Sequence, residues 1–361
     1  MITNKGIAVN TGCKNSSHIV ELEMPLINEN EVLGRVLEVG ICGTDSELDE
    51  GLYGDTPTES SFLVIGHESF GIVESVGSKV SNFNKGDYVV AMVRRPCHAC
   101  INCDNEENDM CLTGDYLERG IKGLHGYMVN YYKENSQFLV KIPHRHRNVG
   151  VLLEPLSIVE KAVTQTIEMQ KRMFWAPKKA LVLGAGPIGL LATMILRTEG
   201  MDVYNIATRT KDSLKAQLVC ATGASYINVK KDPISTLKDK IGSFDIIIDA
   251  TGSSKVAFDS LELLQTNGVM CLTSVTCGNR KIEIEADKLN LDLVLGNKIV
   301  YGTVNSNKNH FVAGIRHFDE FEKRWPLLLE RLITRRLPFQ NFKKALTKEA
   351  EGIKTILEVG K

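Results

Sequence analysis

The chain has 361 residues, of which 43% are hydrophobic and 24% charged, and its formal net charge is −1. This length predicts two domains, and this composition is typical of a folded globular protein with a sizeable core. A charge so near zero argues against nucleic acid or an anionic membrane as partner. Neither a secretory signal nor an apolar run of about 18 residues is visible, so we expect a cytoplasmic protein without a membrane span.

Residues 1–158 are rich in short strand-like segments separated by glycine turns. The clearest are EVLGRVLEVGI at 31–41, GIVESV at 71–76 and DYVVAMV at 87–93. Such segments, bounded by glycine and polar loops, predict a β-rich domain of barrel or Greek-key type.

Four of the nine cysteines follow the spacing C-x2-C-x2-C-x7-C: Cys97, Cys100, Cys103 and Cys111. In a reducing compartment such a cluster indicates metal binding rather than disulfides. Four thiolates can close a tetrahedral shell around Zn²⁺, which predicts a structural zinc site in a lobe at about 94–115. An iron–sulfur cluster uses the same ligands and stays an alternative. A nucleic-acid zinc module is disfavoured by the neutral charge.

The other cysteines are scattered, and apart from Cys42 each is interpreted as a small buried hydrophobe. They are Cys13, Cys42, Cys220, Cys271 and Cys277.

From residue 179 short apolar strands alternate with helix-like segments. The strands are expected at 180–183, 203–207, 226–229, 245–248, 269–273 and 299–301. The helices are expected at 187–198, 211–221, 234–241, 256–264 and 289–295. This alternation predicts an α/β fold with a doubly wound parallel sheet, whose six strands are the number that a full dinucleotide-binding fold uses.

A glycine motif joins the first of these strands to the first helix: Gly184, Gly186 and Gly189, with Pro187 and Ile188 between them. Three glycines at this spacing are weak evidence alone, but here they follow a strand, open a helix and begin a series of strand–helix units. Backbone N–H groups at the start of such a helix bind a pyrophosphate. We therefore expect a dinucleotide here, rather than an empty tight turn.

The end of the second strand indicates which dinucleotide binds. NAD-binding folds place an acid there for the ribose 2′-hydroxyl. This chain has no acid at that point, whereas Thr208, Arg209 and Lys211 can donate to a 2′-phosphate. NADP is therefore favoured, although cations in a loop can also be merely solvated.

The pattern changes after residue 306. Helices are expected at 309–324 and 326–334, followed by a strand at 353–359. We interpret this tail as a return to the first domain. The predicted division is therefore 1–158 with 307–361 as one domain, and 159–306 as an inserted nucleotide domain.

Three separate segments carry side chains that suit an open catalytic Zn²⁺. Cys42 and Thr44 follow the strand at 31–41, His67 and Glu68 lie before Gly71, and Glu154 lies just before the nucleotide domain. Taken singly, a cysteine at a strand end is usually packing and a His-Glu pair is usually on the surface. Spacing alone cannot join segments so far apart.

Together the motifs CGTD, GHE(x)2G, the four-cysteine lobe and GxGPxG, in that order, resemble the zinc-dependent medium-chain dehydrogenase superfamily. Narrower strings resemble archaeal-type glucose 1-dehydrogenases within it: VRRP at 93–96, GLHGYM at 123–128, and Val304-Asn305 followed by NHF at 309–311. The resemblance implies a GroES-like catalytic domain beside a Rossmann domain, and a homotetramer.

The resemblance also implies the roles of the metal-site residues. Cys42, His67 and Glu68 match the ligands of catalytic zinc, and Glu154 matches the position that completes the shell directly or through water. Thr44 matches the hydroxyl that relays the proton.

Sugar and cofactor contacts follow from the same resemblance. Glu118 and His310 match positions that bind sugar hydroxyls, and Glu154 is also assigned to the substrate. Asn307 matches a position that reaches cofactor or sugar, and Asn305 is assigned to the cofactor. Ile158 departs from the pattern, because related sequences can carry an acid there.

The expected reaction is the oxidation of an aldose at C1 to the aldonolactone, with hydride transfer to NADP⁺ or NAD⁺. Glucose is the first candidate, with galactose and xylose next. A polyol or threonine dehydrogenase shares the Cys-His-Glu set and is the alternative. A binding protein without chemistry is disfavoured because every expected metal-binding residue is present.

Overall fold

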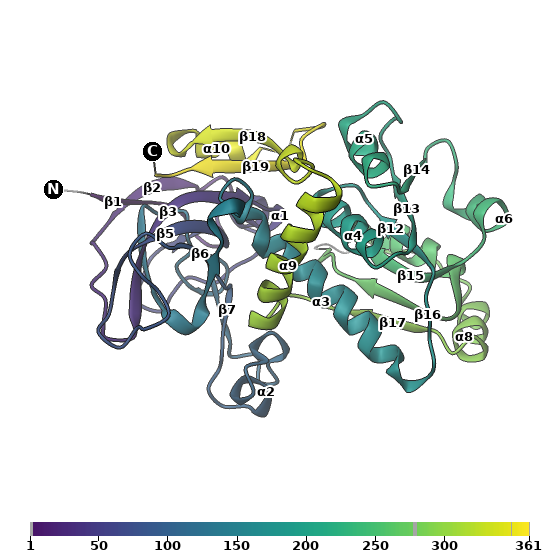
Figure 1. Cartoon of the computed structure of the whole chain (residues 1–361), viewed down its shortest axis with the longest axis horizontal. Helices are drawn as coiled ribbons and strands as arrows, with labels where there is room; N and C mark the ends of the chain where they lie inside the picture. The colour runs from purple at the N-terminus through teal and green to yellow at the C-terminus, as the bar shows by residue number, and fades with distance from the viewer. Residues whose placement is uncertain (1–2, 277–279, 348, 361) are drawn as a thin grey trace. The chain divides into compact units, whose positions relative to one another are not determined.

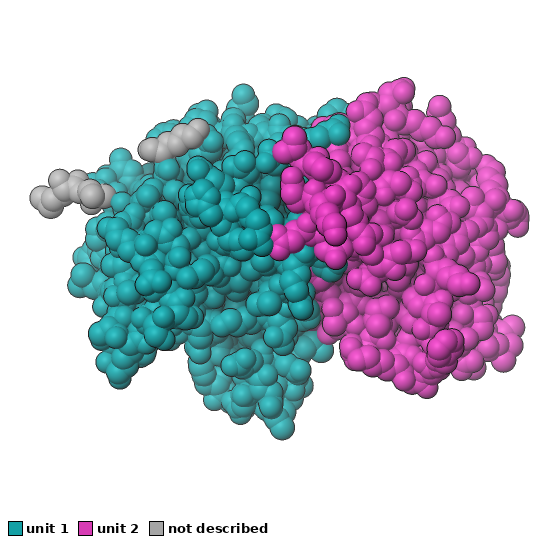
Figure 2. Space-filling view, viewed as in Figure 1, with its two compact units in different colours: residues 1–157, 305–318, 329–361 teal, residues 158–304, 319–328 magenta. Residues whose placement is uncertain are grey.

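The computed structural model describes residues 3–276, 280–347 and 349–360. These residues form two compact units, shown in Figure 2: unit 1 comprises 1–157, 305–318 and 329–361, and unit 2 comprises 158–304 and 319–328. Residues 319–328 were assigned with the rest of the tail to the first domain. They belong to unit 2 instead, where Arg324 Nη1 donates to the carbonyl of Arg197 at 3.4 Å.

Unit 1 consists mainly of strands in three sheets (Figure 1). Their orders are β2-β1-β4, β11-β6-β5-β3-β19-β18 with β10 paired to β3, and β7-β8-β9. The strands are β1 (Asn4–Val9), β2 (His18–Leu22), β3 (Glu31–Ile41), β4 (Leu63–Val64), β5 (Glu68–Val76), β6 (Tyr88–Ala91), β7 (Arg94–Arg95), β8 (Leu117–Arg119), β9 (Gly123–Leu124), β10 (Tyr131–Asn135), β11 (Leu139–Ile142), β18 (Ile333–Pro338) and β19 (Lys354–Glu358).

The helices of unit 1 are short: α1 (Gly43–Asp49), α2 (Ile101–Asp104) and α10 (Phe342–Leu346). Two longer helices, α3 (Leu153–Met169) and α9 (Lys308–Arg324), each contain a boundary between the units. Apolar side chains on the inner faces of the strands form one core, which includes Val36 and Val39 of β3 and Leu357 of β19.

Unit 2 is a doubly wound fold with a six-stranded parallel sheet in the order β14-β13-β12-β15-β16-β17. Its strands are β12 (Lys179–Leu183), β13 (Asp202–Ala207), β14 (Ser225–Asn228), β15 (Phe244–Asp249), β16 (Leu264–Leu272) and β17 (Ile299–Gly302). Its helices are α4 (Pro187–Thr198), α5 (Leu214–Ala221), α6 (Leu237–Ile241), α7 (Ser254–Asp259) and α8 (Ala286–Leu295). The direction of winding reverses between β12 and β15, and ligands bind at such a reversal.

The predicted fold class is confirmed, with all six expected parallel strands present. The helix expected at 326–334 is wrong. Leu327 has a φ of 63°, which an α-helix cannot accommodate, and the segment continues into β18. Among the helices that the structure describes, none has the length and apolar character needed to cross a membrane.

The scattered cysteines differ from one another in burial. Cys271 is buried in β16, as expected, whereas Cys13 and Cys220 are exposed, so the prediction of burial was wrong for these two. Cys13 lies in a polar loop, whereas Cys220 lies on the exposed side of α5 although its neighbours Leu218 and Val219 are buried. Cys277 lies outside the described residues.

Candidate active site

Cys42, His67 and Glu68 come together in unit 1, with one donor atom of each lying within 4.8 Å of the others. Cys42 follows β3 and precedes α1, while Glu68 begins β5. These two strands pair in antiparallel register with Gly40 opposite Glu68, which brings the carboxylate beside the end of β3. A Cβ atom at Gly40 would lie 2.1 Å from Oε2 of Glu68, so this approach requires glycine.

Asp45 and Lys354 hold the trio in place. The backbone N–H of Cys42 donates to Oδ2 of Asp45 at 2.8 Å, and Oδ1 of the same carboxylate lies 3.6 Å from Nδ1 of His67. The ammonium of Lys354, on β19, donates to the carbonyl of Ile41 at 3.0 Å and to Glu68. Sequence reasoning gave neither residue a role.

The trio and its neighbours are strongly coupled by charge. Burial lowers the pKa of His67, but the Asp45 carboxylate and then the Cys42 thiol raise it by more, so the pKa is well above its usual value. Burial raises the pKa of Glu154 to about 7, although His67 opposes this shift. Glu154 is buried in the first turn of α3 and interacts with the charges of the trio. It is not one of the residues whose donor atoms lie within 4.8 Å of one another.

The donor set fits zinc. A thiol, an imidazole and a carboxylate are three of the ligand types that bind Zn²⁺, and three protein ligands leave a position for water or substrate. Thr44 is half-buried in the first turn of α1, two residues after Cys42.

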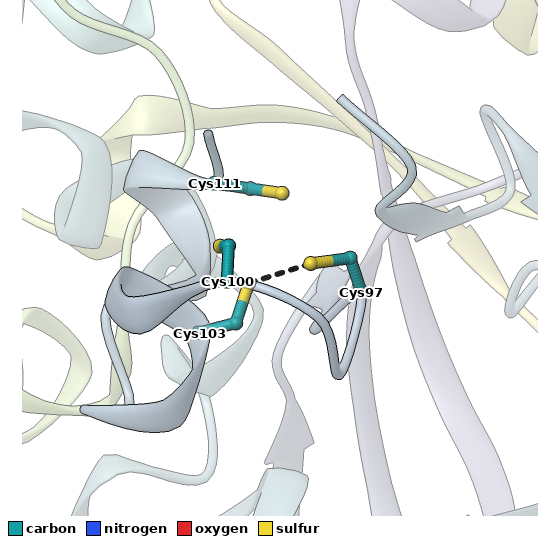
Figure 3. A group of neighbouring side chains, drawn as sticks. All are labelled: Cys97, Cys100, Cys103 and Cys111. Carbon is teal, nitrogen blue, oxygen red and sulfur yellow. Dashed lines mark hydrogen bonds between the residues drawn. The ribbon is translucent and has the colours of Figure 1, made fainter. Parts of the chain in front are cut away.

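The four cysteines of the lobe also converge, as Figure 3 shows. Their sulfur atoms all lie within 4.8 Å of one another, and Cys97 Sγ is 3.7 Å from Cys103 Sγ. The N–H of Leu112 donates to Cys100 Sγ at 3.5 Å, and this bond is the largest cause of the lowered pKa of that thiol. Four thiols that converge in this way fit a closed tetrahedral metal site.

The glycine turn of unit 2 lies between β12 and α4. Gly184 has a φ of 102°, which favours glycine, and a Cβ atom at Gly189 would lie 2.0 Å from the carbonyl oxygen of Gly184. At Gly186 a Cβ atom would meet nothing within 4 Å. The turn is therefore closely packed at Gly189 and open at Gly186, which leaves room for a pyrophosphate at the start of α4. Pro187 and Ile188 are the first residues of this helix.

Thr208, Arg209 and Lys211 follow the end of β13. Thr208 and Lys211 are exposed and Arg209 is half-buried. The hydroxyl of Tyr226 on β14 donates to the carbonyl of Arg209 at 2.8 Å, which fixes the backbone of this segment.

The residues assigned to the sugar fall in two groups. At the start of α9, the N–H of Asn309 donates to Oδ1 of Asn307 at 3.1 Å, and the N–H of Asn307 donates to Nδ1 of His310 at 3.2 Å. A neutral His310 therefore carries its proton on Nε2. Buried Glu118 instead lies beside Asn305, whose Nδ2 donates to it at 2.7 Å, so a residue assigned to the cofactor contacts one assigned to the sugar.

Comparison with known proteins places the chain in a family. A family profile for the alcohol dehydrogenase GroES-like domain matches residues 28–144, and one for the glucose dehydrogenase C-terminus matches residues 147–359. The glucose 1-dehydrogenase of Methanocella arvoryzae is 47% identical over 357 residues, which cover 99% of each chain. The chain belongs to the glucose 1-dehydrogenase family.

Further relatives of this family agree over the full length. Glucose 1-dehydrogenase 1 of Caldivirga maquilingensis is 41% identical over 98% of this chain and 99% of its own. The solved structure of Haloferax mediterranei glucose dehydrogenase in complex with NADP, Zn and gluconolactone matches with a TM-score of 0.91 at 32% identity, covering 99% of each chain. The predicted resemblance to zinc-dependent medium-chain dehydrogenases is thus confirmed, and the chain is a dehydrogenase of the glucose 1-dehydrogenase type.

Proposed function

We propose that this chain oxidises D-glucose at C1 to the lactone and transfers the hydride to NADP⁺. The convergence of a thiol, an imidazole and a carboxylate at Cys42, His67 and Glu68 carries the proposal. It is supported by the solved relative from Haloferax mediterranei, which binds NADP, Zn and gluconolactone.

Cys42, His67 and Glu68 would hold the catalytic metal, with Glu154 completing the shell directly or through water. When bound, Zn²⁺ supplies a Lewis acid that lowers the pKa of a substrate hydroxyl, and NADP⁺ supplies the hydride acceptor. The hydroxyl of Thr44 would receive the proton and pass it to solvent. Lys354 holds the Glu68 carboxylate by a hydrogen bond, and the Asp45 carboxylate places a negative charge beside the imidazole.

The polar residues of unit 1 would select the sugar. Glu118 accepts from one hydroxyl, while His310 and Asn307 offer further polar contacts. A site built to bind hydroxyls rejects analogues that lack them, because the buried polar group would lose its partner. Galactose and xylose are expected as weaker substrates, because galactose inverts the C4 hydroxyl of glucose and xylose lacks its C6 hydroxymethyl group.

The cofactor would bind to unit 2. The N–H groups at the start of α4 would face the pyrophosphate across Gly186, and Thr208, Arg209 and Lys211 would donate to the 2′-phosphate. NAD⁺ is expected as a weaker alternative. The four-cysteine lobe would hold structural zinc, and the homotetramer implied by the resemblance is tested by light scattering.

The test is to follow NADPH formation by the zinc-loaded protein with glucose, galactose, xylose, sorbitol and threonine, and to repeat the series with NAD⁺. We expect the highest kcat/KM with glucose and NADP⁺. If NADP⁺ or NAD⁺ is reduced only with sorbitol or threonine, the chain is a polyol or threonine dehydrogenase and the proposal is overturned.

A further inference from the structure

We propose that Arg94 is a positioning residue for sugar recognition, which fixes Glu118 so that one carboxylate oxygen is saturated by the protein and the other accepts from a substrate hydroxyl. The inference rests on the proposed function, since it takes Glu118 to contact the sugar. Arg94 and Glu118 face each other on the paired strands β7 and β8.

Within the described part of the chain, the side-chain hydrogen bonds of Glu118 all converge on one oxygen. Arg94 donates to Oε1 through Nε at 3.1 Å and through Nη2 at 2.9 Å, and Asn305 donates to the same atom through Nδ2 at 2.7 Å. Three donors exceed the two lone pairs of a carboxylate oxygen, so Oε1 has no capacity for a ligand.

The other oxygen is available. Among the described residues none donates to Oε2 of Glu118, and this oxygen is not fully buried. It therefore keeps contact with solvent, although the residue as a whole is only 4% exposed. A buried carboxylate with one saturated and one open oxygen is suited to accept a single hydroxyl donor from a fixed direction.

Arg94 is itself held by the four-cysteine lobe. Its Nη1 donates to the carbonyl of Asp109 at 2.9 Å, and Nδ2 of Asn108 donates to the Arg94 carbonyl at 2.6 Å. The ring of Tyr116 lies 3.7 Å from the guanidinium carbon. Asn108 and Asp109 lie just before Cys111, so the lobe that gathers the thiols also fixes the residue that orients Glu118.

This arrangement requires arginine. The guanidinium donates from Nε and Nη2 to Glu118 while Nη1 reaches the lobe, and the rigid fork keeps these directions fixed. Lysine would keep the positive charge but would offer one flexible ammonium, which would leave the carboxylate free to rotate. Arg94→Lys therefore tests orientation separately from charge.

The experiment measures kcat/KM for glucose and for its 2-deoxy, 3-deoxy, 4-deoxy and 6-deoxy analogues with wild type, Glu118→Gln, Arg94→Lys and the double variant. Glu118→Gln should reduce discrimination against one deoxyglucose, which identifies the hydroxyl that Glu118 binds. Arg94→Lys should reduce discrimination at that same position by about tenfold or more, mainly through KM for glucose, because hydrogen bonds to charged groups are worth about that factor. The double variant should lose little beyond Glu118→Gln, and the KM for NADP⁺ should not change.

Asn305→Gly gives a second, milder test. It removes one donor to Oε1 without removing a charge, and glycine accepts the φ of 61° found at Asn305. We expect a smaller loss of discrimination at the same hydroxyl, and this variant carries the test if Arg94→Lys does not fold.

Arg95→Lys is the matched control, because Arg95 is also buried but pairs with Glu134 in the core. It should lower thermal stability without changing discrimination among deoxyglucoses. If Arg94→Lys and Arg95→Lys lower kcat/KM equally for every sugar, Arg94 is only structural and the inference is wrong. A wild type that oxidises no aldose would instead overturn the proposed function, and this inference with it.

Discussion

Each member of the candidate zinc trio has a buried charged side chain beside it. Asp45 receives the backbone N–H of Cys42 and lies beside His67, while Lys354 holds Glu68. Such outer contacts orient metal ligands and tune their basicity. The residues of the trio are thus preorganised by buried charges rather than by local chain geometry alone.

Replacing the thiol tests the trio directly. Cys42→Ser should lower the zinc content by one ion per chain and reduce glucose oxidation by at least about 100-fold, since even outer-contact mutations cost 10–100-fold. A serine hydroxyl does not ionise near neutral pH and is a poor replacement for a thiolate. NADPH binding, measured by fluorescence titration, should not change, because the glycine turn lies in unit 2.

Cys220→Ser is the control, because Cys220 is exposed on α5. It should keep full zinc content and activity. Full activity in Cys42→Ser would remove Cys42 from the metal site.

At the scale of elements, the turn from β12 to α4 contains glycines for two different reasons, one of packing and one of ligand access. Gly189 is required by packing, since its position faces the carbonyl of Gly184, whereas Gly186 faces open space. The φ of −82° at Gly186 is open to any residue, so backbone strain does not explain a glycine there. What remains is the need to leave room for a ligand.

Two alanine variants of this turn should behave oppositely. Gly189→Ala should destabilise the protein by about 1–3 kcal/mol through overpacking. Gly186→Ala should change stability by less than about 1 kcal/mol, yet raise the KM for NADP⁺, because the methyl group would occupy the place of the pyrophosphate. Thermal melts and cofactor titrations of both proteins measure this, and equal loss of stability in both would contradict it.

At the scale of the whole molecule, the candidate metal sites and the candidate nucleotide site belong to different units. Both candidate metal groups lie in unit 1 and the glycine turn lies in unit 2. Each unit also has its own hydrophobic cluster. The free energy of metal binding should therefore stabilise unit 1 in particular.

Chelation should make this visible by hydrogen exchange. Removing metal should speed amide exchange in the cysteine lobe and in β7 and β8, because Arg94 links these segments. The strands β12–β17 should exchange as before, since they contribute no residue to either metal group. Faster exchange throughout unit 2 would show that the metals stabilise the chain globally.

Local sequence patterns were sufficient to predict those elements whose structure depends on residues close by in the chain. The strand at 31–41 and the helix at 187–198 have the expected bounds, because alternation and a Gly-Pro start define them within a few residues. The four-cysteine lobe is equally local. The helix expected at 326–334 does not form, because the backbone at Leu327 has a positive φ where the chain turns toward β18. Short-range sequence patterns do not predict such a turn.

The site itself needed the tertiary structure. Only the register of β3 and β5 brings Cys42 to Glu68, and only the pairing of β19 with β3 brings Lys354 to the same carboxylate. Arg94, Glu118 and Asn305 meet in the same way, from segments far apart in the chain. The sequence by itself determined the donor types and the strand–helix order, since these are local. Which donors meet was decided by long-range strand pairing, because burial of a whole sheet face, and not any short motif, fixes its register.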